Sequence, residues 1–237
     1  MSLSDCNQAM TIRLLITIGV LGCVSGIAGP SFAGEVHGRI LVTKTLTKRR
    51  VVLPDYQMRG VALPPKPETT QALDEYSRTV IYIDGGSPAA GKTATKTLDQ
   101  KDIHFSPPIL VIPVGSTVSF PNSDPIFHNV FSFSKAKQFD LGYYPAGETR
   151  TVKFDKVGIV QVYCHIHRDM NAAILVVPSD HYVQPDPDGM FTLADVTAGT
   201  HNVVVWHKSA GFFNKRVQVS AAGSVEVSFT IPVPTTE

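Results

Sequence analysis

The sequence consists largely of short runs rich in β-branched and aromatic residues, bounded by proline, glycine or asparagine, and no helical apolar repeat is sustained beyond residue 33. Such runs are typical of β-strands, because branched side chains pack well on a pleated surface. Many short strands separated by turn residues predict an all-β sandwich fold. We expect strands at 35–42, 78–83, 109–113, 116–120, 128–133, 148–154, 158–164, 172–177, 190–193, 201–207, 215–219 and 224–231.

The pattern of the sequence changes near Pro178, and we place a domain boundary there. One domain is expected at 34–177, followed by a small β module at 178–237 that packs on it. The module is near the lower size limit for an independent core, so we expect it to depend on docking. The long stretch 43–77 between the first two strands is interpreted as an insertion or mobile loop.

The first 33 residues have the features of a signal peptide. Arg13 precedes the apolar run Leu14–Leu21, and Ser31-Phe32-Ala33 offers the small residues that a signal peptidase recognises. The run is shorter than the roughly 20 apolar residues of a membrane span, and no later segment approaches that length. Lipid attachment at Cys23 is the alternative. We expect a periplasmic or otherwise extracytoplasmic protein with no transmembrane segment in the mature chain.

The charge of the chain is balanced. Lysine and arginine together number 21, against 20 acidic residues, which gives a formal net charge of +1. Nothing in this balance indicates binding to nucleic acid or to an anionic membrane. Docking to a partner would therefore depend on local patches.

Cys164 is the only cysteine left once the signal segment is removed, so it has no partner for a disulfide within the chain. An unpaired thiol in an oxidising compartment is a liability unless something occupies it. His167 and Met170 follow Cys164 in the same loop, and His128 comes from a different expected strand. Two imidazoles, one thiolate and a weak axial thioether are the ligand set of a blue-copper electron-transfer site.

At these residues the sequence resembles a known family. Residues 34–177 resemble the cupredoxins, the plastocyanin and azurin group of β-sandwich copper proteins. Phe127-His128-Asn129-Val130 looks like the plastocyanin segment around its first histidine ligand, and Phe120-Pro121-Asn122-Ser123-Asp124 before it also fits the family pattern. Tyr163-Cys164 followed by His167 matches the ligand loop of the same family. The resemblance implies a Greek-key β-sandwich.

The resemblance also implies roles for individual residues. His128, Cys164 and His167 would form the trigonal ligands of one type 1 copper ion, with Met170 as the axial ligand. The spacing between His167 and Met170 is shorter than in plastocyanin and similar to that in amicyanin. Asn129 would tie the two ligand-bearing segments together, and groups of this kind fix the orientation of the ligands.

The C-terminal 60 residues are similar to small transthyretin-like or carboxypeptidase-regulatory-like β modules. The similarity rests on Asp188-Gly189-Met190-Phe191-Thr192-Leu193 and on Gly199-Thr200-His201-Asn202-Val203. It consists mostly of hydrophobic alternation and turn residues. Packing against the copper domain is the role that we expect for this module.

The function that follows is a shuttle of single electrons between a donor and an acceptor redox protein, such as a cytochrome or a dehydrogenase. The alternative is a copper-binding carrier or sensor that does not transfer electrons. A third possibility is a structural module whose copper has no functional role. Stable cycling between two copper states would favour the shuttle, and easy copper release to a chelator would favour the carrier. A site saturated by four ligands leaves no open position for a substrate, so we expect no enzyme.

Three further motifs suggest no additional site. Gly86–Thr93 fits the phosphate-binding loop pattern, but no amphipathic helix follows it, so nucleotide binding is not expected. Asp186 and Asp188 resemble part of a calcium loop, but the surrounding prolines favour a hairpin turn. His165, which departs from the family pattern inside the ligand loop, should point away from Cys164 and lie in solvent near the docking face.

Overall fold

The computed structural model describes residues 33–43, 74–85 and 95–232. The expected signal peptide, most of the 43–77 stretch and the phosphate-loop motif therefore lie outside the described residues. The described chain is all-β, as the sequence predicts, and its one short helical turn is a 3₁₀ turn, η1, at Tyr76–Arg78. None of the helical structure in these ranges is long and apolar enough to cross a lipid bilayer.

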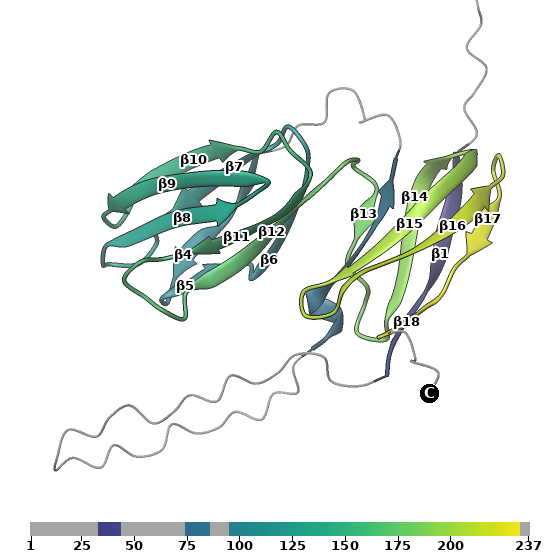
Figure 1. The fold of residues 1–237 in the computed structure, drawn as a ribbon, viewed down its shortest axis with the longest axis horizontal. Coiled ribbons are helices and arrows are strands. Elements are labelled where there is room, and N and C mark those ends of the chain that lie inside the picture. Colours follow the sequence, from purple (N-terminus) through teal and green to yellow (C-terminus); the bar gives the residue numbers. More distant parts are fainter. Residues whose placement is uncertain (1–32, 44–73, 86–94, 233–237) are drawn as a thin grey trace, which may run out of the picture. The chain divides into compact units, whose positions relative to one another are not determined.

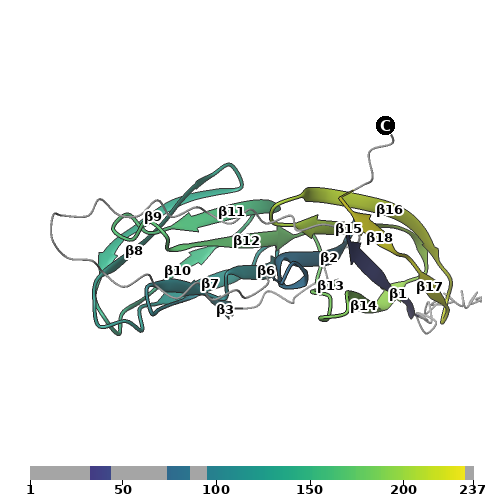
Figure 2. The ribbon, with the colours of Figure 1, turned by 90° about the horizontal axis from the view of Figure 1, so that it is seen from below.

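One group of strands forms a sandwich that contains every expected copper ligand (Figure 1). A five-stranded sheet in the order β6-β12-β11-β8-β9 faces a three-stranded sheet in the order β10-β7-β3, and β4 pairs with β5. Figure 2 shows β7 and β10 on one side of this group and β9 and β11 on the other. The bounds are β3 (Thr95–Thr97), β4 (Asp99–Lys101), β5 (His104–Ser106), β6 (Ile109–Pro113), β7 (Thr117–Pro121), β8 (His128–Ser134), β9 (Lys137–Tyr144), β10 (Thr149–Lys153), β11 (Gly158–Tyr163) and β12 (Asn171–Val177).

Alternating side chains of these strands build the core between the two sheets. In β7, Val118 and Phe120 are buried and Ser119 between them is only partly so, as expected for a strand with one face in the core. β12 differs, because six of its seven residues are buried. Its even-numbered side chains, such as Ile174, pack into the sandwich core, and its odd-numbered ones, such as Leu175, pack into a separate cluster on the opposite face.

A second group of strands combines the C-terminal part of the chain with two strands from near its beginning. Its sheets have the orders β14-β1-β17, with β18 also paired to β1, and β13-β2-β15-β16. The bounds are β1 (Ala33–Val42), β2 (Thr79–Asp84), β13 (Tyr182–Val183), β14 (Met190–Thr197), β15 (Gly199–His207), β16 (Gly211–Val219), β17 (Ser224–Glu226) and β18 (Phe229–Ile231).

This pairing differs from the domain division expected at residues 177 and 178. β1 pairs with β14, β17 and β18, and β2 pairs with β13 and β15, so neither belongs to the sheets that carry the ligands. The sandwich around the ligands spans 95–177, and the other group is assembled from both ends of the described chain. A linear reading misses such an arrangement, because strand pairing between distant segments leaves no local signal.

A shared apolar cluster lies between β6 and β12 of the first group and β2 and β15 of the second. Trp206 is its largest member, and residues 32–237 form one compact unit. That residues 178–237 form a module of their own, packed on a copper-binding domain, stays a prediction. The buried members of the cluster are Val80, Tyr82, Ile109, Val111, Ala173, Leu175, Val177, Val204 and Trp206.

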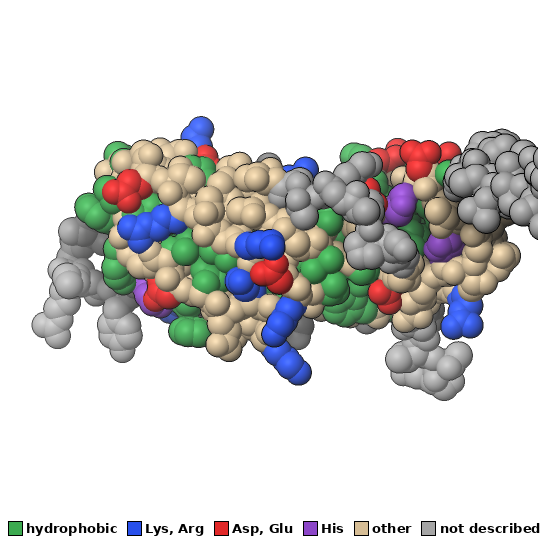
Figure 3. Space-filling view, turned by 90° about the horizontal axis from the view of Figure 1, so that it is seen from above, with side chains coloured by type: hydrophobic (Ala, Val, Ile, Leu, Met, Phe, Trp, Pro, Cys, Tyr) green, Lys and Arg blue, Asp and Glu red, His purple; other side chains and the backbone are tan. Residues whose placement is uncertain are grey.

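The strands that the sequence did not predict are short or polar. β9 has a single buried residue and lies at the edge of its sheet, so its hydrophobic alternation is weak. β3, β4 and β5 have three residues each, and they occupy the stretch after the phosphate-loop motif where no helix was expected. Figure 3 shows basic and acidic side chains interspersed on the face it presents, in line with the balanced composition.

Candidate copper site

The candidate ligands come from the ends of neighbouring strands. His128 is the first residue of β8, and Cys164 directly follows β11. The turn from β11 to β12 contains His167 and Met170. Two backbone hydrogen bonds hold this turn together: the Cys164 amide donates to the Met170 carbonyl at 3.3 Å, and the Met170 amide donates to the His167 carbonyl at 3.0 Å.

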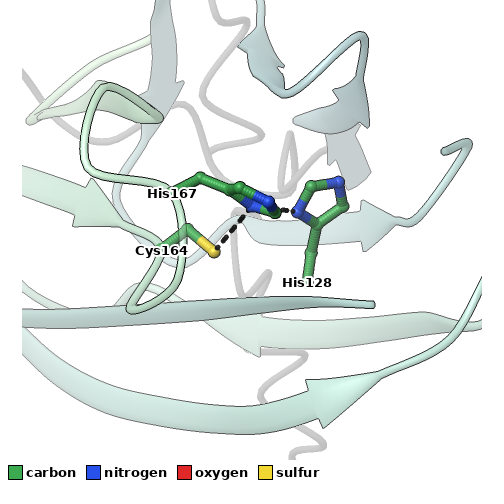
Figure 4. Close-up of side chains that lie close together, drawn as sticks. All are labelled: His128, Cys164 and His167. Carbon is green, nitrogen blue, oxygen red and sulfur yellow. Dashed lines mark hydrogen bonds between the residues drawn. The ribbon is translucent and has the colours of Figure 1, made fainter. Parts of the chain in front are cut away.

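Three donor atoms converge from these elements (Figure 4). The Nδ1 atoms of His128 and His167 are 3.0 Å apart, and the Cys164 Sγ lies 3.7 Å from the His167 Nδ1. All three donor atoms lie within 4.8 Å of one another. His128 is fully buried, Cys164 is 6% exposed, and His167 is intermediate, so the group is reached from solvent on the His167 side.

Asp124 fixes which nitrogen of His128 can bind a metal. The Asp124 Oδ2 lies 2.7 Å from the His128 Nε2, and because a carboxylate only accepts, Nε2 carries the proton. The Nδ1 atom is left with a free lone pair, and it faces His167. Burial raises the pKa of the Asp124 carboxyl, but hydrogen bonds from the Ile103 amide, His128 and the Asp102 amide outweigh burial, so this pKa lies below its usual value.

The second imidazole is also suited to metal binding. Burial, together with the nearby His128, lowers the pKa of His167, although Asp124 opposes the shift. A lowered pKa keeps the ring neutral, which is the form that binds a metal. Two neutral imidazoles and one thiol that loses its proton on binding form a borderline and soft donor set that fits copper. His128, Cys164 and His167 would hold such an ion.

Met170 ends the turn that holds Cys164 and His167, and its role as the axial ligand stays a prediction. It is 1% exposed and belongs to the same buried cluster as Cys164. Packing in the core would by itself explain this position, since methionine fills irregular gaps.

Asn129 makes a different contact from the one that the resemblance implied. Its side-chain amide donates to Asp140 of β9 at 2.7 Å, while its side-chain oxygen is buried without a hydrogen-bond partner. Asn129 therefore ties β8 to β9 in this structure, and the expected tie to the Cys164 segment stays a prediction. The carboxyl of Asp140 has a lowered pKa, first because the Gly142 amide donates to it.

The remaining candidates lie apart from the group. His165 is exposed and its ring packs against Phe131, with centroids 3.8 Å apart, as expected for a residue that does not ligate. The Asp186 Oδ1 accepts from the Asp188 and Met190 amides, so this segment is a turn. It is not the expected hairpin, because β13 and β14 on either side of it belong to different sheets. Within the ranges that the structure describes, no other set of three histidine, cysteine or acidic side chains is close enough to share a metal.

Asp124 is the site residue that the sequence reasoning missed. It belongs to the segment on which the family resemblance rests, but no role was assigned to it. Its spacing of four residues from His128, across Pro125, was the available signal. That spacing has no fixed meaning outside a helix, so only the structure brings the two side chains together.

Solved structures similar to part of this chain include copper-containing proteins. No protein-family model matches the sequence, and the curated proteins include no match. A copper-containing nitrite reductase from Thermus scotoductus is 28% identical over 35% of this chain and 22% of its own, with a TM-score of 0.34. A purple cupredoxin from Nitrosopumilus maritimus is 26% identical over 35% of this chain and 98% of its own, with a TM-score of 0.31. An amicyanin variant with Cu(I) is 22% identical over 40% of this chain and 97% of its own, with a TM-score of 0.33.

The all-β fold and the group formed by His128, Cys164 and His167 confirm the resemblance to cupredoxins over the ligand-bearing part of the chain. The resemblance of the C-terminal strands to transthyretin-like or carboxypeptidase-regulatory-like modules is not confirmed.

One expectation requires correction. The sequence reasoning excluded an enzyme on the ground that four ligands saturate the copper. The similar structures include a nitrite reductase, so enzymes occur among the proteins that this chain is similar to, and the exclusion was wrong.

Proposed function

We propose that this protein binds one copper ion in a type 1 site and carries single electrons between redox proteins. The observation that supports the proposal is the convergence of two imidazole nitrogens and one cysteine sulfur on a β-sandwich, with His128 and Cys164 buried and His167 partly exposed. Copper would supply the one-electron redox couple. The chain would supply the trigonal ligands His128, Cys164 and His167, with Met170 as a weak axial ligand.

The placement of the ligands suits electron transfer. His128 is fixed at the start of β8, and the turn that holds Cys164 and His167 is closed by backbone hydrogen bonds. Ligands held in this way by the strands would keep their positions in both oxidation states. Little rearrangement would then oppose the transfer of an electron.

The route to a partner would pass through the exposed side of the site. His167 is the least buried of the three ligands. Two apolar neighbours in the sequence are also exposed: Ile166 beside His167 is 50% exposed, and Phe127 beside His128 is 56% exposed. An apolar surface around a partly exposed ligand suits brief contact with another redox protein. We place this encounter in the periplasm or another extracytoplasmic space, because the N-terminal sequence has the features of a signal peptide.

The visible spectrum with Cu(II) tests the proposal directly. The protein is expected to become intensely coloured through charge transfer from the Cys164 thiolate, and to return to the same spectrum after repeated reduction and oxidation. Cys164→Ser should remove the colour, whereas Ser132→Ala, a change at a buried β8 residue outside the ligand group, should keep it. A colourless complex of the wild-type protein would contradict the type 1 site.

The same sample separates the shuttle from a carrier. A shuttle should retain its copper against a moderate chelator in both oxidation states, because the ligands form a closed cage. Rapid loss of Cu(I) to the chelator would instead favour a copper carrier.

A further inference from the structure

Asp124 is a buried carboxylate that contacts one expected ligand, His128, and among the residues that the structure describes it pairs with no lysine or arginine. It is 5% exposed. Its Oδ1 accepts from the Asp102 amide at 2.6 Å, and its Oδ2 accepts from the Ile103 amide at 2.9 Å and from the His128 Nε2 at 2.7 Å. A buried carboxylate in a purely structural role would usually be paired with a cation, so this arrangement needs another explanation.

We propose that Asp124 is a positioning residue that selects the His128 tautomer and favours Cu(II) over Cu(I) at the site. This inference rests on the proposed copper function and adds to it the control of the redox balance. It concerns the contact between Asp124 and His128, which acts through the ligand and not on the metal directly.

The contact with Asp124 determines the tautomer of His128. Because the carboxylate accepts from Nε2, the proton of a neutral His128 ring is held at that atom. Nδ1, the atom that faces His167, is thereby ready to bind before copper arrives. Without Asp124, the proton would distribute between the two nitrogens, and part of the protein would have the binding atom blocked.

The turn between β4 and β5 holds the Asp124 carboxylate in place. Asp102 and Ile103 connect β4 to β5 with φ angles of 54° and 61°, in the left-handed region that non-glycine residues rarely adopt. In this conformation both amides point at Asp124. An unfavourable turn that supplies two hydrogen bonds to one carboxylate indicates that the position of this carboxylate is specified by the fold.

The negative charge of Asp124 also acts on the site through His128. A carboxylate bonded to the far nitrogen of a ligating histidine raises the basicity of that ligand. Its negative charge also stabilises the more highly charged metal state, and burial strengthens this effect, because little water screens it. Both effects favour Cu(II), so the carboxylate should lower the reduction potential.

The test compares Asp124→Asn with Asp99→Asn. Asp99 is the matched control: it accepts from Ser123, the neighbour of Asp124, but touches no ligand. Asp124→Asn should weaken Cu(II) binding relative to Cu(I) about tenfold, which raises the potential by about 59 mV. The Asp99→Asn potential should stay close to that of the wild type. Equal potentials for Asp124→Asn and the wild type, or the same rise in both variants, would overturn the proposal.

A metal-free measurement keeps the inference separate from the proposed function. Nitrogen-15 NMR of wild-type His128 should show the proton on Nε2, and this readout requires neither copper nor a folded variant. A proton on Nδ1 would refute the role of Asp124 even if the site is blue. Conversely, a colourless site with the Nε2 tautomer would sink the type 1 assignment and, with it, the redox part of the inference, while the tautomer part would stand.

Discussion

At the scale of single residues, the site depends on which atoms the protein presents and which it protects. Cys164 and His128 are buried and Met170 almost completely so, while His167 keeps one side near solvent. With copper bound as proposed, this gradient would give the ion a shielded set of ligands and one side from which an electron could enter or leave. The role of Met170 as the axial ligand can be tested by a substitution that keeps the volume of the side chain nearly unchanged.

We expect Met170→Leu to keep copper and colour, because the trigonal ligands contribute most of the binding. If Met170 is the axial ligand, loss of its sulfur should disfavour Cu(II) and raise the potential by tens of millivolts, where about 59 mV corresponds to a tenfold change. Voltammetry measures this. Met190→Leu, the same change at a 45% exposed residue of β14, is the control. An unchanged potential in Met170→Leu would show that Met170 only packs.

His207, which lies outside the copper site, should make the stability of the protein depend on pH. Its Nδ1 accepts from the Ser209 and Ala210 amides, and its Nε2 contacts Glu75 at 2.9 Å. Burial lowers the pKa of His207 from its ordinary 6.5, although Glu75 opposes the shift. A proton on Nδ1 would break both amide contacts.

The sign of the pH dependence follows from this lowered pKa. As the pH falls through about 6.5, the unfolded chain takes up the proton before the folded protein does, so the free energy of unfolding decreases. At higher pH this penalty is absent. Urea unfolding of the metal-free protein from pH 7.5 to 5.5 should show the decrease, and His207→Gln should make it smaller. Part of the decrease should remain, because the pKa of His167 is also lowered. An identical slope in the variant would mean that other groups cause it.

At the scale of elements, β1 is the strand that binds the C-terminal part of the chain together. It pairs antiparallel with β14 and parallel with β17 and β18. At Gly38 this strand passes very close to the segment after β17: a Cβ at Gly38 would lie 1.8 Å from the Val227 carbonyl oxygen. The Val227 amide donates to the His37 carbonyl at 2.8 Å, so this backbone cannot move away without losing a hydrogen bond.

Gly38→Ala should therefore destabilise the protein by roughly 1–3 kcal/mol or more, as overpacking against backbone does. The copper spectrum of the folded protein should not change, since Gly38 lies outside the sandwich that carries the ligands. Chemical unfolding and the visible spectrum measure the two effects. Arg39→Ala, at the exposed position next to it, serves as the control and should have a much smaller effect. Wild-type stability in Gly38→Ala would contradict the close approach.

At the scale of the whole molecule, the ligand-bearing sandwich is a continuous piece inserted between strands of the other group. Its core cluster, from Leu98 to Val176, lies entirely within 95–177. All four expected ligands lie there too. A fragment that ends at residue 178 would keep β1 and β2 but lack the C-terminal strands that pair with them. A fragment that also begins after β2 is therefore the better way to isolate the site.

We expect the fragment 95–178 to fold and to show the full-length colour with Cu(II). It should melt at a lower temperature, because residues such as Val111, Leu175 and Val177 would lose the cover of Trp206. The fragment 178–237 should stay unfolded, since it lacks β1 and β2. Melting curves with and without copper measure both. Cooperative unfolding of 178–237 at the full-length temperature would contradict the need for the missing strands.

The sequence alone determined the class of fold and pointed to the three candidate ligands that the structure brings together. Strand type is local, so alternation and turn residues predicted most of the strands, including β6, β8, β11 and β12. The spacing of Cys164, His167 and Met170 within one turn was likewise local, and the structure brings Cys164 and His167 together with His128.

Only the tertiary structure decided how distant segments pair. The pairing of β1 and β2 with the C-terminal strands, the bond from Asn129 to Asp140, and the contact of Asp124 with His128 all depend on neighbours that sequence order does not reveal. The physical reason is that strand partners and side-chain contacts between segments are chosen by the burial and hydrogen bonding of the complete fold. A local pattern shows which face of a strand is apolar, but not what covers it.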